Sequence, residues 1–516
     1  MPPSPSTTGP DRDHSFPGLV PESDADRRLV ERVHPPDWRN PAPADAYNLV
    51  VLGGGTAGLV CAAGAAGLGA RVALVERRLL GGDCLNYGCV PSKAVLVAAR
   101  AVADARAVRA AGLMTGDEPG ADFTAAMSRM RRLRAEIAAH DSAARFRDLG
   151  VDVFIGDARF ADTRSVEVNG ARLRFARAVV ATGSRPSVPP VPGLEAAGYL
   201  TSETVFGLTT LPRRLVVLGA GPIGCELAQA FARFGSAVTM VSLDAEILPG
   251  DDPDASRIVQ ARLVADGVVM VLGARATAVT TTAGGRRLHF DRGRGDESVE
   301  GDVLLVATGR DPNVEGLGLE AAGVAVGPSG VTVDDRLRTT NRRVYAAGDV
   351  CSRQRFTHAA DAMARVVIQN ALFFGRRSAS ALVIPRCTYT DPELAHIGWR
   401  ASEAEAAGHR VRTIEVPMRG VDRAVLDGDT DGFARLHVTA RGRILGGTIV
   451  ARHAGEMIGT LSVAMAAGLG APTLSNAILP YPTQAEALRK LGDTYRRSML
   501  TPRLRALLTR VLAWRR

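Results

Sequence analysis

The sequence contains almost no lysine. Among its 63 lysine and arginine residues, only Lys93 and Lys490 are lysines. Alanine and glycine are abundant, and the whole composition is typical of a GC-rich coding bias. Under such a bias a lysine that persists is informative, because most lysines on a protein surface could have become arginine. We therefore treat Lys93 as a candidate functional residue.

Long apolar runs and a dense set of cysteines are also missing. No apolar run reaches the ~18–20 residues of a membrane span, and the N-terminus lacks the apolar core of a signal peptide. Six cysteines in 516 residues do not make a disulfide scaffold. We therefore expect a cytoplasmic protein whose length allows several domains with well-buried cores.

The charge balance raises the question of an anionic partner. Basic residues outnumber acidic ones 63 to 54, and the formal net charge of +9 would permit binding to nucleic acid or an anionic surface. The arginines are spread along the chain, however, and nothing resembles an RNA- or DNA-reading motif. We expect no nucleic-acid partner.

One supersecondary plan occurs twice in the chain. A short apolar strand at 47–52 leads into the turn GGGTAG and an Ala-rich helix, and a second strand follows at 71–76. The plan restarts at 215–218 with GAGPIG, and each copy closes on an ATG segment. This repetition predicts two doubly wound α/β nucleotide-binding domains. From about residue 383 strands and helices mix without a nucleotide motif, which predicts an α+β domain.

The first glycine-rich turn has the features of a dinucleotide site. Gly53, Gly55 and Gly58 lie between a strand and a helix. Glycines allow a tight turn and the close approach of a pyrophosphate, and the helix N-terminus supplies N–H donors. Glu76 ends the next strand, where its carboxylate can accept hydrogen bonds from ribose hydroxyls. This full context, rather than the glycines alone, indicates the site.

The second turn leaves the identity of its nucleotide open. Gly219, Gly221 and Gly224 stand in the same context, but the following strand ends on Ser242. Glutamate at that position would favour NAD through the ribose 2′-hydroxyl, and arginine would favour NADP through the 2′-phosphate. Neither residue is present.

A pair of cysteines lies between the two turns, in GGDCLNYGCVPSK. Cys84 and Cys89 precede Pro91, which suits the first turn of a helix. A helix N-terminus stabilises a thiolate and lowers its pKa, as thiol–disulfide exchange requires. Zinc is a poor alternative, because the spacing is unusual and no second Cys/His pair is obvious. Two unreactive core cysteines are the remaining alternative.

These motifs make the chain resemble the pyridine nucleotide–disulfide oxidoreductases, which include lipoamide dehydrogenase, glutathione reductase and mercuric reductase. GGGTAG, CLNYGC, both ATG segments, GAGPIG and AAGDV occur in the family's order between about residues 47 and 495. The resemblance implies a homodimeric enzyme with FAD in the first nucleotide fold and NAD(P)H in the second. It implies that FAD contacts Gly53, Gly55, Gly58, Glu76, Gly82, Thr182, Gly183, Gly348 and Asp349, and that NAD(P)H contacts Gly219, Gly221, Gly224, Glu226, Ser242 and Gly309.

The same resemblance implies roles for the residues around the flavin. Cys89 would be the thiol against the flavin, and Cys84 the interchange thiol that meets the substrate. Lys93 would lie near the flavin N5 position, paired with Glu226. Asp349 would bond the side chain of the flavin.

The domain organisation follows from the same comparison. The expected segments are an irregular N-terminal arm (1–45), the first part of an FAD-binding domain (46–195), an NAD(P)-binding domain (196–312), the second part of the FAD-binding domain (313–382), a dimerisation domain (383–495) and a basic amphipathic tail (496–516).

The C-terminal end departs from the disulfide reductases. Lipoamide dehydrogenase and glutathione reductase place a base there, a His-Pro-Thr segment with a Glu five residues after the His, and it acts across the dimer interface. Here the segment is Tyr481-Pro482-Thr483 with Glu486. A tyrosine with an ordinary pKa near ~10 is a poor proton shuttle at neutral pH. Mercuric reductase is similar in having tyrosine at this place, and its soft metal substrate suits paired thiolates.

The resemblance to mercuric reductase is incomplete. Mercuric reductases carry a vicinal cysteine pair at the C-terminus, whereas no cysteine follows Cys387 here. We expect a mercuric reductase-like enzyme that reduces Hg(II) or a similar metal or thiol-reactive acceptor. The alternatives are a dihydrolipoamide dehydrogenase-like or general disulfide reductase, and a flavoprotein redox sensor with little turnover.

The other cysteines and one histidine have no motif around them. We expect Cys61, Cys225 and Cys387 to serve in packing. We assign no role to Cys351. His358 opens the helix after the flavin motif, where a capping or packing role is the favoured interpretation.

The tail has the pattern of a basic amphipathic helix. Thr501 and Pro502 can cap and start it, and arginines surround an apolar face that consists of Leu504, Leu507, Leu508, Val511 and Leu512. We favour docking of this face on the protein's own dimer. Weak contact with an anionic membrane surface is the alternative.

Overall fold

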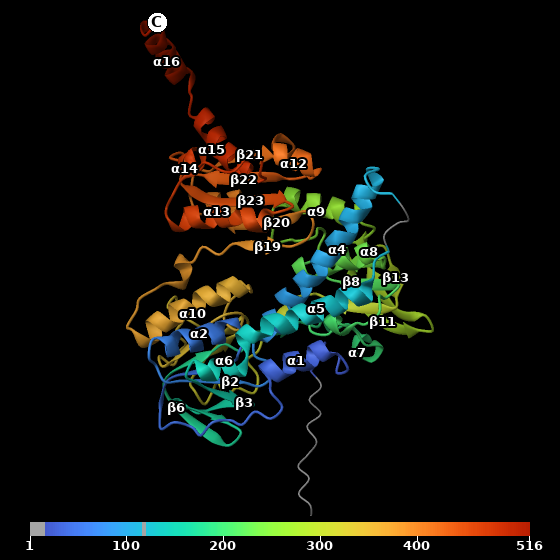
Figure 1. Ribbon diagram of the computed structural model, residues 1–516, viewed down its shortest axis with the longest axis vertical. Helices are drawn as coiled ribbons and strands as arrows, with labels where there is room; N and C mark the ends of the chain where they lie inside the picture. The colour runs from blue at the N-terminus through green and yellow to red at the C-terminus, as the bar shows by residue number, and fades with distance from the viewer. Residues whose placement is uncertain (1–15, 116–119) are drawn as a thin grey trace, which may run out of the picture.

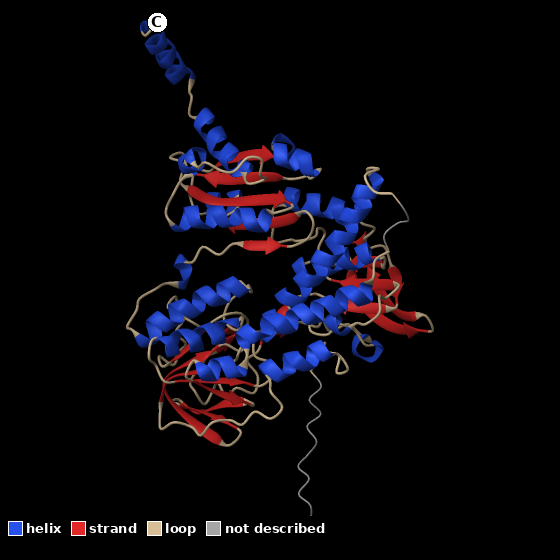
Figure 2. Cartoon of the chain, in the orientation of Figure 1, coloured by secondary structure: helices blue, strands red, loops and turns tan. Residues whose placement is uncertain are grey.

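The computed structural model describes residues 16–115 and 120–516 of the chain. Two α/β units form the lower part of Figure 1, and a unit built from the C-terminal residues lies above them. Figure 2 shows that each unit has its own sheet. The predicted fold class, two doubly wound α/β domains followed by an α+β domain, is confirmed.

The first sheet consists of short apolar strands. Its parallel part has the order β3-β2-β1-β6-β18, β5 pairs antiparallel with β6, and β4 pairs antiparallel with β5. Because β18 pairs with β6, the chain returns to this sheet after completing the second unit. The strands are β1 (Tyr47–Leu52), β2 (Val72–Glu76), β3 (Val151–Ile155), β4 (Ala158–Asp162), β5 (Ser165–Val168), β6 (Ala171–Val180) and β18 (Val344–Ala346).

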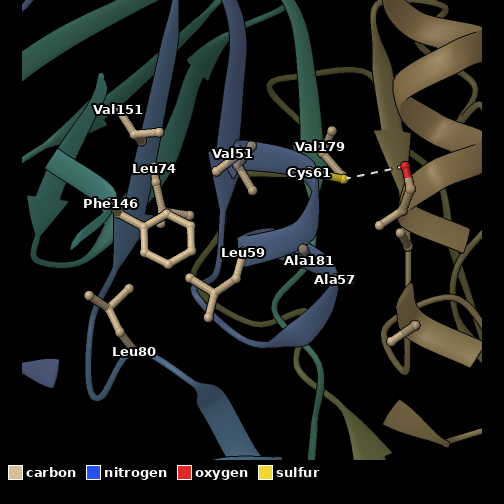
Figure 3. Close-up of a cluster of buried hydrophobic side chains, with 14 of the residues drawn as sticks. Val51, Ala57, Leu59, Cys61, Leu74, Leu80, Phe146, Val151, Val179 and Ala181 are labelled. Carbon is tan, nitrogen blue, oxygen red and sulfur yellow. Dashed lines mark hydrogen bonds between the residues drawn. The ribbon is translucent and has the colours of Figure 1, made fainter. Parts of the chain in front are cut away.

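Helices α2 (Thr56–Gly67) and α10 (Thr357–Leu372) pack against each other beside this sheet. Cys61 of α2 is fully buried, and its thiol lies 3.8 Å from the carbonyl oxygen of Ala364 in α10 (Figure 3). The packing role predicted for Cys61 is therefore confirmed. Small residues dominate α2, which lets the two helices approach closely.

The second sheet repeats the plan of the first. Four parallel strands have the order β10-β9-β8-β14, and an antiparallel three-stranded sheet, which the sequence analysis did not predict, lies beside them. The parallel strands are β8 (Arg214–Leu218), β9 (Ala237–Val241), β10 (Val269–Val271) and β14 (Val303–Val306), with helices α8 (Pro222–Phe234) and α9 (Pro253–Ala265). The antiparallel strands are β11 (Arg275–Thr282), β12 (Gly285–Asp291) and β13 (Asp296–Gly301).

The two units are joined by paired strands and by helix packing. Strands β7 (Ser184–Pro186) and β15 (Arg310–Pro312) pair where the chain leaves the first unit and where it comes back. The long helix α4 (Cys89–Ala110), preceded by the short α3 (Gly82–Asn86), packs against α8 of the second unit. The first residue of α4 is thus held between the two nucleotide folds.

The C-terminal unit is a five-stranded antiparallel sheet with helices. The strand order is β19-β20-β23-β22-β21, and the last helix, α16, projects beyond the unit in Figure 1. The strands are β19 (Arg386–Thr388), β20 (Glu393–Gly398), β21 (Arg412–Pro417), β22 (Phe433–Val438) and β23 (Ile444–Ala451). The helices are α11 (Ala401–Ala406), α12 (Asp422–Asp427), α13 (Ala454–Ala466), α14 (Ala471–Asn476), α15 (Glu486–Ser498) and α16 (Pro502–Trp514).

The expectation of an irregular N-terminal arm is wrong for part of its length. Helix α1 (Asp24–Val33) buries Leu29 and Val33 against the first unit and packs on α5 (Phe123–Ile137). Its Asp26 accepts a hydrogen bond of 2.7 Å from Arg134, whose side chain is fully buried. The pairing partner lies about a hundred residues away, so the composition of the arm alone did not reveal the helix. Residues 1–15 of the predicted arm lie outside the described part of the chain.

Across residues 16–115 and 120–516, no helix combines the length and the apolar character needed to cross a membrane.

Candidate active site

A large cavity connects the two nucleotide folds. Its volume is about 1970 Å³ and its walls come from both folds. Pockets for one small molecule usually measure about 300–1,000 Å³, so this cavity has room for two ligands of dinucleotide size. Of the residues predicted to bind cofactors, all but Gly58 and Gly224 line it, and Cys84, Cys89 and Lys93 line it as well.

The first glycine-rich turn is shaped for a phosphate group. Gly53 has φ +105°, a conformation that side chains disfavour. A Cβ on Gly58 would collide with the carbonyl oxygen of Gly53, so Gly58 allows α2 to lie close to β1. Gly55, the N-cap of α2, provides no side-chain cap, so the N–H groups of the first turn stay available to a ligand.

Glu76 is fixed at the wall of the cavity by backbone hydrogen bonds. Its carboxylate accepts one from Gly54 N (2.6 Å) and one from Arg78 N (2.7 Å). Burial raises the pKa of Glu76, and these two bonds oppose that shift. The carboxylate is thus oriented before any ligand arrives.

The second turn has the same construction. Gly219 has φ +111°, and a Cβ on Gly224 would collide with the Gly219 carbonyl oxygen. The space beside Gly221 is open, and Gly221 begins α8 without a side-chain cap. Ser242 follows β9 at the cavity wall, and its backbone carbonyl accepts a hydrogen bond from Ala274, the neighbour of Arg275. Arg275, which also lines the cavity, was not identified by the sequence analysis.

The two cysteines of the predicted redox pair meet in the cavity. Cys84 lies in α3, and Cys89 is the first residue of α4. The hydrogen bond from the Cys84 thiol lowers the pKa of Cys89 to about 6, with further contributions from Thr357 and Lys93, although burial opposes the shift. The same bond raises the pKa of Cys84. The pair therefore holds one thiolate and one thiol at neutral pH.

Thr357 is a contact that the sequence analysis missed. It is the first residue of α10, and its hydroxyl oxygen lies 3.4 Å from the Cys89 sulfur. His358 follows it, and its ring bonds the carbonyl oxygen of Pro385 at 2.6 Å and stacks on Phe356. The ring makes packing contacts as predicted, but His358 is exposed and lines the cavity, so its packing role is incomplete.

Lys93 and Glu226 form an ion pair across the two folds. The Lys93 ammonium, one turn after Cys89, lies 2.8 Å from the Glu226 carboxylate. Although burial acts to lower it, the carboxylate holds the pKa of Lys93 above its usual value. Glu226 also accepts a hydrogen bond from Tyr389 N (2.9 Å), and the Lys93 ammonium sits over the Tyr389 ring. The pairing expected for Lys93 is present.

A polar network surrounds Asp349, which follows β18. Its carboxylate accepts a hydrogen bond of 2.6 Å from the Ser184 hydroxyl. Arg310 donates to the same hydroxyl (2.8 Å) and pairs with Asp83 at 3.0 Å. Asp83 is the neighbour of Cys84, so this network connects the flavin motif to the thiol pair. Ser184 and Arg310 were not predicted from the sequence, because both act through side-chain contacts between distant segments.

Tyr481 and Glu486 are not brought to the cavity of the same chain. The Tyr481 side chain is 70% exposed, and its hydroxyl donates a hydrogen bond to Asp422 (2.9 Å), which raises the tyrosine pKa. Glu486 begins α15 and accepts a hydrogen bond from Arg489 at 2.8 Å. The hydroxyl is therefore a donor rather than a base.

The other cysteines differ in their surroundings. Cys225 is fully buried in α8, as expected for a packing role. Cys351 donates to the Gly348 carbonyl, and burial raises the pKa of Cys351 to about 12. Cys387 is only partly buried and lines the cavity, so its packing role is incomplete. Among the described residues, no three His, Cys, Asp or Glu side chains are grouped as a metal site would require.

Comparison with protein families gives two matches. A model of the pyridine nucleotide-disulphide oxidoreductases matches residues 47–365. A model of the dimerisation domain of the same proteins matches residues 384–491.

Individual proteins are similar over most of the chain. A mercuric reductase of Lysinibacillus sphaericus is 34% identical, covering 87% of this chain and 83% of that protein. Dihydrolipoyl dehydrogenase 2 of Haloarcula marismortui is also 34% identical, covering 87% and 96%. Among solved structures, the Cu(II) complex of the HOCl-induced flavoprotein disulfide reductase RclA from Escherichia coli has a TM-score of 0.77 at 28% identity, covering 87% of this chain and 99% of that one.

The geometry predicts a thiolate on Cys89 of the reduced protein that persists down to about pH 6. An unperturbed cysteine has a pKa near ~8.5 and is mostly protonated at neutral pH. Because the pKa is lowered, the thiolate is present above about pH 6 and is lost as the pH falls through that value. The ultraviolet thiolate absorbance of the reduced protein minus that of Cys89→Ser, recorded against pH, measures this midpoint.

A second variant tests the cause of the shift. Thr357→Val removes the hydroxyl beside the Cys89 sulfur and should move the midpoint to higher pH. A wild-type midpoint near ~8.5 would show that the surroundings do not stabilise the thiolate.

Proposed function

The chain belongs to the pyridine nucleotide-disulphide oxidoreductase family, and we propose that it uses Cys84 and Cys89 to reduce a soft metal ion, Hg(II) or a similar thiol-reactive acceptor. One observation carries this proposal. The two thiols converge in the cavity, while the hydroxyl of Tyr481, at the place of the family's histidine base, is bonded to Asp422.

The class of enzyme follows from the family. The chain is an NAD(P)H-dependent flavoprotein oxidoreductase with FAD and NAD(P)H as cofactors. When bound, FAD supplies a ring system that accepts a hydride and passes the electrons on. The dimerisation domain supports a homodimer. We place the enzyme in the cytoplasm, because its electron donor is an intracellular metabolite.

The cavity fits two dinucleotides on structural grounds. Each glycine-rich turn ends at a helix N-terminus without a side-chain cap. In each turn a Cβ would fill the space beside one glycine or strain the backbone at another. In the proposed arrangement α2 holds the pyrophosphate of FAD and α8 that of NAD(P)H. Glu76 would bond ribose hydroxyls of FAD, and Ser242 would face the ribose of NAD(P)H.

The thiol pair would work with Lys93. We assign Cys89 to the flavin side, since it stands at the start of α4 with its pKa lowered, and Cys84 to the acceptor side. Lys93 would hold positive charge beside the thiolate, and Glu226 would fix the position of the ammonium. This arrangement compensates the charge of the reduced pair at the wall of the cavity.

A soft metal ion suits this chemistry. Thiolates are preferred ligands of soft metals, and two electrons from NAD(P)H convert Hg(II) to Hg(0), with NAD(P)⁺ and a proton as the other products. No leaving thiol has to be protonated, so the absence of a histidine base is tolerated. The mercuric reductase relatives and the Cu(II) complex of RclA support a metal acceptor.

Disulfide reduction is the second candidate. Its support is the dihydrolipoyl dehydrogenase relative, which is as similar as the mercuric reductases. Release of a reduced disulfide needs a proton for the leaving thiolate. Tyr481 supplies one poorly, because Asp422 raises the pKa of its hydroxyl. We therefore rank this activity below metal reduction.

The first test uses mercury as acceptor. Purified holoenzyme with excess small thiol should oxidise NADPH when Hg(II) is added, and Cys84→Ala should lower this rate at least about a hundredfold while retaining FAD, because the metal loses a sulfur ligand. Cys351→Ala is the matched control and should retain the wild-type rate. Full activity of Cys84→Ala would sink the thiol mechanism, and no response to Hg(II) or Cu(II) in the wild-type protein would rule against a metal acceptor.

The second test replaces Tyr481. Tyr481→His places a base with a pKa near ~6.5 beside Asp422 and should raise lipoamide reduction about tenfold or more, since proton transfer contributes at least that much in such reactions. Hg(II)-dependent turnover should change little. Tyr481→Phe is the control, because it removes the hydroxyl without adding a base. Equal disulfide turnover in all three proteins would show that this position does not limit the reaction.

A further inference from the structure

The last helix stands apart from the rest of the protein. Every residue from 496 to 516 is exposed, and α16 extends away from the C-terminal unit (Figure 1). The match to the family's dimerisation model ends at residue 491, before this segment begins. Its function must therefore be derived from its own side chains.

Helix α16 begins with its own capping residues. Thr501 is its N-cap, and the hydroxyl oxygen accepts a hydrogen bond of 3.3 Å from Leu504 N. Pro502 occupies the first turn, where its fixed φ suits a helix. These features start a 13-residue helix about 20 Å long. A helix of this length is marginal in water on its own, so a surface that covers its apolar side would stabilise it.

The side chains of α16 divide into two groups around the helix. Apolar residues recur at helical spacing on one side, and all are well exposed: Leu504, Leu507, Leu508, Val511, Leu512 and Trp514. Arg505 borders one edge of this face, and Arg503 and Arg510 border the other. Arg515 and Arg516 follow at the end, and no acidic residue occurs after Asp493.

We propose that α16 binds the surface of an anionic phospholipid membrane, with its apolar face at the boundary of the acyl chains. Arginines on both edges of an apolar face can direct their guanidinium groups to lipid phosphates while their aliphatic stems cover apolar surface. The uniformly positive charge complements an anionic surface. A protein partner would instead have to offer a hydrophobic groove with acidic side chains along both edges, because the charged residues of α16 are all arginines.

The proposal makes the enzyme a peripheral membrane protein. The thiol pair lies in α3 and α4, and the two nucleotide folds supply most of the cavity wall. In Figure 1, α16 lies at the far side of the C-terminal unit from these two folds. Binding through α16 would therefore bring the enzyme to the membrane without occupying its active site.

The test uses full-length dimeric holoenzyme and sedimented vesicles. Binding is measured with vesicles of phosphatidylcholine alone and of phosphatidylcholine mixed with phosphatidylglycerol. We expect strong binding to the mixed vesicles, weak binding to the neutral ones, and a decline as salt is raised. A protein that ends at Ser498 should lose this binding and keep its NADPH-dependent activity.

Point variants separate the contribution of the arginines from that of the apolar face of α16. The double variant Arg505→Gln/Arg510→Gln should weaken binding to the mixed vesicles about thirtyfold, from the contribution of each arginine near an anionic surface. Leu507→Gln/Leu508→Gln should reduce it strongly without changing the charge. Thr509→Gln, on the polar side, is the matched control and should bind like the wild type.

Three results would overturn the proposal. The protein that ends at Ser498 could bind the mixed vesicles as well as the full chain, which would place the contact elsewhere on this basic protein. The full-length protein could bind neutral and anionic vesicles equally, or neither. Removal of α16 could convert the dimer to monomers while the full-length dimer ignores vesicles, which would assign the helix to the dimer interface.

Discussion

The ion pair between Lys93 and Glu226 determines how the two nucleotide folds meet. Lys93 belongs to α4, which begins at Cys89, and Glu226 belongs to α8, which begins at the second glycine-rich turn. Holding these charges 2.8 Å apart brings two helix N-termini to one cavity. Removing Lys93 would leave the buried Glu226 carboxylate without its partner, at a cost of about 3–5 kcal/mol in comparable cases.

The charged and polar groups of the site each stabilise the next one. The Glu226 carboxylate neutralises Lys93, the Lys93 ammonium favours the Cys89 thiolate, and the Cys84 thiol donates to that thiolate. Thr357, on a helix of the first fold, adds a contact from the other side. A stable Cys89 thiolate depends on all of these contacts, because each one favours the charged form of the sulfur. The proposed electron path from NAD(P)H to an acceptor rests on this arrangement.

Local patterns were sufficient to predict both nucleotide folds and the thiol pair. The glycine-rich turns and the acid at the end of β2 have fixed spacings, because a phosphate-binding turn can be built in few ways. Contacts between distant segments were not predictable in this way. Thr357 and Arg310 carry no motif, and the bond from Tyr481 to Asp422 depends on how a loop near α15 packs on α12. Helix α1 was missed for the same reason, since Asp26 finds its buried partner Arg134 only in the folded chain.

The central claim is that electrons from NAD(P)H reach the bond between Cys84 and Cys89. The most direct measurement treats the oxidised holoenzyme with a thiol-alkylating reagent under denaturing conditions, before and after one equivalent of NADPH in the absence of oxygen. Mass spectrometry then reports the labelling of each cysteine. The account predicts that Cys84 and Cys89 are protected at first and both labelled after NADPH, while the other cysteines are labelled in both samples. Flavin reduction with no change in the labelling of these two cysteines would contradict it.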